Sequence, residues 1–238
     1  MKLNFLRKLH IGFYGHSVSC FAGKPESFID QVSERLNAKI VNVGVPQGSE
    51  ERILFDLKKT KTIDIAVIFH SPTPRYIFLP LCNRDIAVNV IPTNKANVLW
   101  SEGGNRKNIT PEEFEKEFTY GKIKEVFGDM DTFIKTMQLN KKFLYHQDLV
   151  KNRYEGARCL IDSYCLQKIP KVIHVIDYHQ ENIGNWFKFQ SGIVNYELGK
   201  ISEKHYDQNT NPNNLSNEGN RIMSDKIIEI IEGQGWNK

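Results

Sequence analysis

Short apolar runs alternate with amphipathic segments over the first 70 residues. The apolar runs are rich in β-branched and aromatic side chains, which is typical of buried strands. The segments between them place apolar residues at helical spacing, and Ser49 stands where it would cap the second helix. Strands that alternate with helices predict a parallel sheet built from βαβ units. The predicted strands are residues 9–15, 38–45 and 63–69, and the predicted helices are residues 27–36 and 49–57.

The alternation pauses after residue 70 and resumes near residue 170. Prolines and glycines interrupt short apolar pieces until Thr110-Pro111-Glu112-Glu113, which has the cap, proline and acids of a helix start. Helical patterning follows, then a fourth buried strand over residues 171–177 and a last helix from about Ser216. We therefore expect a single α/β domain over residues 1–238: a three-layer α/β/α sandwich on a central parallel sheet, with a large, mostly helical insertion at about 71–168.

Two further segments each allow two interpretations. The apolar stripe over residues 141–168 predicts either a long helix packed on the sheet or an interface for a protein partner or a second copy of the chain. Residues 185–189 alternate apolar and polar positions, which predicts either an extra strand or a wall of the site.

Composition and charge narrow the class of protein. The formal net charge of +4 over 238 residues is too small to indicate a nucleic-acid partner. No apolar run approaches the ~18 residues of a membrane span, so no membrane association is expected. The four cysteines form no C-x-x-C pair, so we expect reduced thiols in the cytoplasm, with no metal and no cofactor.

The candidate chemistry begins with Gly15-His16-Ser17, at the end of the first predicted strand. In open parallel sheets, ligands bind at the carboxyl ends of the strands, so Ser17 is well placed to be a nucleophile. The same serine could instead cap a helix or bond a turn. No Gly-x-Ser-x-Gly, Gly-x-Gly-x-x-Gly or Gly-Lys-[Ser/Thr] motif is present.

Three more segments give the chain its resemblance to a known family: Val43-Gly44-Val45, Phe69-His70-Ser71-Pro72, and the polar run from Asn211 to Asn220. In order and spacing, these blocks resemble the SGNH, or GDSL-like, hydrolase superfamily over about residues 1–70 and 170–232. Parts of the sequence also look like SGNH-like proteins encoded by bacteriophages, which would place the protein in the host cytoplasm or the virion. The resemblance implies a flavodoxin-like sandwich and an acyl-transfer site.

The resemblance assigns roles, and this chain departs from several of them. Ser17 matches the nucleophile and Gly44 matches an oxyanion-hole donor. His16 replaces the aspartate of the G-D-S block, and Ser71 stands near the place of a missing asparagine. The family's D-x-x-H block reads Asn211-Pro212-Asn213-Asn214, and an amide cannot act as a general base. The residues expected to line the site are Ser17, Gly44, His16, Ser71, Asn211 and Asn214.

Another histidine would have to replace the missing base. His205 lies six residues before the degenerate block, and His70 follows the third strand, so both are candidate catalytic residues. His174, inside an apolar strand, is interpreted as a hydrogen-bonded core residue. Two functions remain open: a serine hydrolase with an impaired or rebuilt triad, acting on a small acyl ester or an O-acetylated glycan, and a non-catalytic protein that binds a glycan or a protein.

Overall fold

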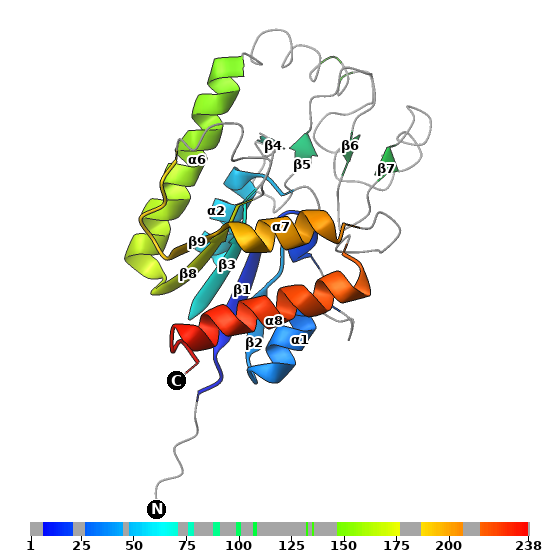
Figure 1. The fold of residues 1–238 in the computed structure, drawn as a ribbon. Helices are drawn as coiled ribbons and strands as arrows, with labels where there is room; N and C mark the ends of the chain where they lie inside the picture. The colour runs from blue at the N-terminus through cyan, green and yellow to red at the C-terminus, as the bar shows by residue number, and fades with distance from the viewer. Residues whose placement is uncertain are drawn as a thin grey trace, which may run out of the picture.

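The computed structural model describes residues 7–20, 27–44, 48–70, 76–78, 88–90, 99–100, 107–108, 132, 135, 147–176, 187–206 and 215–237. For Ser17, residues 147–151 and the short strands between residues 76 and 108, only the backbone is described. Figure 1 shows the arrangement of the helices and strands.

Five strands of the described part of the chain form one sheet, and every neighbouring pair in it is parallel. Their order is β2-β1-β3-β8-β9. The α/β class is confirmed, as are the four predicted strands. The fifth strand was not predicted, because its three residues are too few to give a pattern. The strands are β1 (His10–Gly15), β2 (Lys39–Asn42), β3 (Ile65–Phe69), β8 (Lys171–Val175) and β9 (Ile193–Asn195).

The helices divide between two apolar clusters. In β3, Ile65, Val67 and Phe69 belong to one cluster, whereas Ala66 and Ile68 belong to the other. Since successive side chains of a strand point to opposite faces, the two clusters lie on opposite faces of the sheet. Helices α1, α7 and α8 contribute to the first cluster, and α2 and α6 to the second (Figure 1). The helices are α1 (Phe28–Arg35), α2 (Glu50–Lys59), α6 (Gln147–Lys168), α7 (Tyr196–Lys204) and α8 (Asn217–Gly233).

Serine side chains cap three of these helices. The hydroxyls of Ser27, Ser49 and Ser216 each accept a hydrogen bond from a backbone N–H in the first turn of α1, α2 and α8. The predicted cap at Ser49 and the predicted start of the last helix near Ser216 are confirmed. These caps fix where the chain enters each helix.

Helix α8 ends beside the start of β8 and begins beside the start of α1, which follows β1 in the chain. At the start of β8, Lys171 Nζ donates to the carbonyl oxygen of Trp236, just beyond the end of α8, at 2.8 Å. The 17 residues of α8 span about 25 Å. The beginning of α8 therefore lies toward the edge of the sheet where the parallel strands end.

The predicted insertion is described only in part. It contains two short antiparallel pairs, and its last element, α6, places Ile161 and Cys165 in the core cluster beside α2. The second half of α6 is therefore a helix packed on the sheet, which was one of the two interpretations. The short strands are β4 (Tyr76–Phe78), β5 (Val88–Val90), β6 (Leu99–Trp100) and β7 (Lys107–Asn108).

Candidate functional site

The turn that follows β1 depends on glycine at its first position. Gly15 has φ +127°, and a Cβ there would overlap the carbonyl oxygen of Phe69 on β3. A short 3-10 turn, η1 (Ser17–Ser19), comes next, and the carbonyl oxygen of His16 accepts bonds from the N–H and the hydroxyl of Ser19, at 2.9 and 2.8 Å. Ser17 therefore begins a tight turn at the carboxyl edge of the sheet, and His16 is buried there.

Gly44, after β2, packs directly against this turn. Its N–H donates to the carbonyl oxygen of Ser19 at 2.7 Å. A Cβ on Gly44 would overlap Ser19 Oγ and lie 2.9 Å from the carbonyl oxygen of Gly15. The structure thus brings together the segments of Ser17 and Gly44. An oxyanion could use the Gly44 N–H only by displacing the Ser19 carbonyl, and this role stays a prediction.

His205 lies against the first turn of α8. It follows the last residue of α7, and its carbonyl oxygen accepts the N–H of Ser216 at 3.0 Å. A Cβ on Gly219 would overlap His205 Cβ and lie 3.2 Å from His205 Cγ. The half-buried residue thus lies against the beginning of α8, and its role as a base stays a prediction. Asn211, Asn214 and Ser71 lie outside the described residues.

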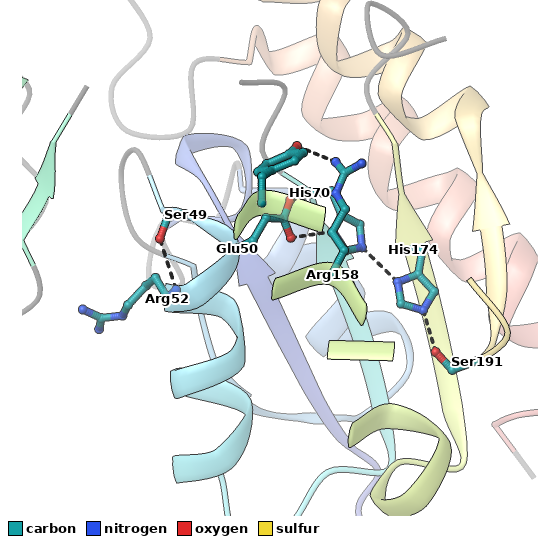
Figure 2. Close-up of polar contacts among 8 residues, drawn as sticks. Ser49, Glu50, Arg52, His70, Arg158, His174 and Ser191 are labelled. Carbon is teal, nitrogen blue, oxygen red and sulfur yellow. Dashed lines mark hydrogen bonds and ion pairs between the residues drawn. The ribbon is translucent and has the colours of Figure 1, made fainter. Parts of the chain in front are cut away.

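His70 faces a different neighbourhood from the one expected for a base beside Ser17. Its Nδ1 lies 2.8 Å from Glu50 Oε2 on α2, and its Nε2 lies 2.9 Å from His174 Nδ1 on β8 (Figure 2). Both ring nitrogens are therefore engaged, in a side chain that is fully buried. For His70 to act as a base for Ser17, one of these contacts would have to break.

The polar contacts continue beyond His174. Its Nε2 lies 2.9 Å from Ser191 Oγ, and Ser191 Oγ donates to Asp162 Oδ1 on α6 at 2.5 Å (Figure 2 shows the contacts from Glu50 to Ser191). Asp162 also accepts the backbone N–H groups of Gln190 and Ser191. The prediction that His174 is a hydrogen-bonded core residue is confirmed.

A cation and an aromatic ring complete this cluster. Arg158 Nε lies 3.3 Å from Glu50 Oε1. The ring of Phe189 stacks on His174, with centroids 4.0 Å apart, and lies tilted against His70, with centroids 4.5 Å apart. Residues 187–190 form no strand, so within the predicted 185–189 segment Phe189 instead covers the histidine pair.

Burial lowers the pKa of both histidines, because loss of hydration disfavours the imidazolium form. For His70, the Glu50 carboxylate opposes this shift. For His174, the neighbouring His70 adds to it.

Sequence reasoning missed most of this cluster. Glu50 follows Ser49 as an ordinary first-turn acid, and neither Asp162 nor Ser191 stands in a motif. The one signal was a histidine inside an apolar strand, because a polar side chain there needs buried partners. Those partners come from α2, α6 and the segment before β9, far apart in the sequence.

Among the residues that the structure describes, no group of three or more His, Cys, Asp or Glu side chains could hold a metal ion. Nor does any helix in the described ranges have the length and apolar character to cross a bilayer.

Comparison with models of known protein families and with curated proteins finds no match for this chain.

Proposed function

We propose that this protein is an SGNH-like serine hydrolase built on a three-layer α/β/α sandwich. Its substrate is a small acyl ester or an O-acetylated glycan. Ser17 is the nucleophile, and His205 replaces the histidine that the family carries before its last helix. Since asparagines occupy the usual acid and base positions, the triad is a rebuilt one.

The order of the strands is the observation that carries this proposal. In the order β2-β1-β3-β8-β9, the chain passes from β1 to a strand on one side and later to a strand on its other side, which creates a switch point between β1 and β3. In sheets of this order, ligands bind at the carboxyl ends of the strands that flank the switch point. Gly15 and Phe69 form the last pair there, and Ser17 follows two residues later.

The proposed reaction is acyl transfer in two steps. Ser17 Oγ attacks the acyl carbonyl carbon while His205 takes the hydroxyl proton, and the leaving alcohol departs with a proton returned by His205. Water then attacks the acyl-enzyme, with His205 again as the base, and releases the acid and free Ser17. The N–H groups of Ser17 and Gly44 hold the developing oxyanion, the latter after exchange of its bond to Ser19.

A second candidate, a non-catalytic protein that binds a glycan or a protein at the same edge of the sheet, is favoured by one observation. Two of the groups that could assist Ser17 are already engaged: the Gly44 N–H with Ser19, and both nitrogens of His70 with Glu50 and His174. This candidate requires binding at the edge of the sheet and no turnover.

The test is labelling with a fluorophosphonate probe, which reacts with activated serines. The wild type should be labelled, Ser17→Ala should not, and Ser163→Ala, which removes an exposed hydroxyl on α6, should be labelled like the wild type. Equal labelling of the wild type and Ser17→Ala would show that Ser17 is not the nucleophile.

Turnover of p-nitrophenyl acetate separates the two candidates. Saturable turnover that Ser17→Ala abolishes supports the hydrolase, and His205→Gln should then lower kcat by about 10²- to 10⁴-fold, as expected for loss of a general base. A folded wild type that is neither labelled nor active favours the binding protein.

A further inference from the structure

Five buried side chains on the α2–α6 side of the sheet form one continuous series of hydrogen bonds. They come from α6, the segment before β9, β8, the residue after β3 and α2, and the series joins these elements independently of Ser17. We call it the buried chain. Its members, in order, are Asp162, Ser191, His174, His70 and Glu50.

The buried chain needs one more proton than its groups carry in their ordinary neutral-pH forms. Four contacts join five groups, and each contact requires one proton between its two heavy atoms. With both carboxylates ionised and both imidazoles neutral, the serine and the two histidines supply only three. A fourth proton is therefore required.

Three groups can carry the fourth proton while Ser191 donates to Asp162: Glu50, His70 and His174. When Glu50 carries it, every bond points from Glu50 toward Asp162. When a histidine carries it, both nitrogens of that ring donate, and the bonds between that ring and Glu50 point toward Glu50. Transfer of one proton across one contact converts each form into the next.

The charges around the buried chain favour the four-proton form. Of the described groups, α6 contributes Asp162, Arg158 and the Tyr154 hydroxyl, which accepts a bond from Arg158, while α2 contributes Glu50. His70 follows the end of β3 and His174 lies in β8, while the segment before β9 contributes Ser191 and the apolar ring of Phe189. With four protons, the charges of these described groups, Arg158 included, sum to zero, and a buried group of charges costs least when it is neutral.

We propose that the buried chain is a pH-sensitive clamp that holds residues 187–191 against α6 and β8 and that is tightest near pH 6.5. Ser191 and Phe189 connect this segment to the histidines, and Asp162 binds two of its N–H groups. Release of the segment would remove the cover from His174 and expose the chain to water.

The direction of the pH effect follows from the proton count. Above pH ~6.5, the opened chain holds three protons and the closed chain four, so opening releases one proton and becomes easier as the pH rises. Below pH ~6.5, both exposed histidines become charged and the opened chain holds five, so opening takes up one proton and becomes easier as the pH falls. The lowered pKa of the buried histidines agrees with the uptake of a proton on opening below pH ~6.5.

The experiment is hydrogen exchange of residues 187–195 between pH 5 and 9, followed by mass spectrometry and corrected for the intrinsic exchange rate. The opening equilibrium constant of the wild type should be smallest near pH 6.5 and rise by up to about tenfold per pH unit on each side. A constant that stays flat from pH 6.5 to 9 would overturn the proposal, whatever the variants do.

Glu50→Gln tests the fourth proton directly. A glutamine amide can donate its own N–H to His70 Nδ1 while its oxygen still accepts from Arg158, so the four contacts are satisfied with neutral histidines. This variant should keep the segment protected and lose the rise above pH 6.5. The matched control Glu51→Gln, an adjacent acid of α2 that pairs with Arg153, should keep the wild-type profile. The same alkaline slope in Glu50→Gln as in the wild type would contradict the proposal.

Discussion

At the scale of single residues, the position of Gly44 could be predicted from the sequence, and the hydrogen-bond partners of His70 could not. The position of Gly44 beside the turn after β1 follows from two parallel strands that end at one edge. The partners of His70 do not follow from any local pattern, because Glu50 is 20 positions away and His174 is 104 positions away. Side-chain pairs of that kind depend on how α2 and β8 pack, which a periodicity does not encode.

Gly44→Ala should destabilise the protein, because the added methyl group has no room between Ser19 Oγ and the backbone of Gly15. The expected loss in free energy of unfolding is about 1–3 kcal/mol, measured by urea denaturation.

Gly156→Ala is the control for this substitution. Gly156 lies within α6, and a Cβ there would have no heavy atom within 4 Å. In that position alanine should stabilise by about 0.5–1 kcal/mol through its higher helix propensity. A Gly44→Ala protein as stable as the wild type would mean that β2 does not pack on the turn as described.

At the scale of elements, capped helices were predictable and the join between β9 and α7 was not. Ser49 and Ser216 precede clear apolar periodicities, so the starts of α2 and α8 could be predicted. In the join, Asn195 is the last residue of a three-residue strand and also caps α7 with its side chain. A segment in which one residue serves two elements gives neither a strand period nor a separate helix start.

Asn220 connects the starts of α1 and α8. Its Oδ1 accepts the N–H of Phe28 at 3.0 Å, and its Nδ2 donates to the carbonyl oxygens of Leu215 and Ser216. Asn220→Ala would leave the buried Phe28 N–H without this acceptor. We expect a loss of about 1–3 kcal/mol in free energy of unfolding.

The exposed Asn217, in the first turn of the same helix, provides the matched control. Asn217→Ala should change the stability by no more than about 0.5 kcal/mol in the same denaturation experiment. Equal effects of the two substitutions would argue against a specific role for Asn220.

At the scale of the whole molecule, the parallel α/β architecture was predictable because its buried strands are nearly all apolar. The strand order did not follow from the sequence, and the packing of the second half of α6 on the sheet was one of two interpretations that the sequence left open. Both depend on contacts between segments far apart in the chain. The proposed site lies at the strand ends, which were predictable from the sequence, together with residues whose roles rest on the proposed resemblance.

The cysteines report on the integrity of the fold. Cys165 is buried between α6 and the sheet, and burial raises the pKa of its thiol to about 12, so almost no thiolate forms at neutral pH. Cys159, on the outer side of α6, is exposed, and Cys20 is buried. Brief treatment of the native protein with a maleimide should modify Cys159 and spare Cys165 and Cys20, as read by peptide mass spectrometry. Rapid modification of Cys165 would contradict the packing of α6, and denaturant should make all three react.

The order of the strands also shapes how the protein is made. β1 pairs with strands that follow within about 60 residues, whereas β3 pairs with β8 from more than 100 residues further along. Closing so long a loop is slow, and during synthesis β8 emerges long after β3. Until then, β3 presents an unpaired edge whose five side chains are all apolar. The half-assembled sheet is therefore the species in which neighbouring nascent chains would most readily aggregate, and the one for which a chaperone would matter most.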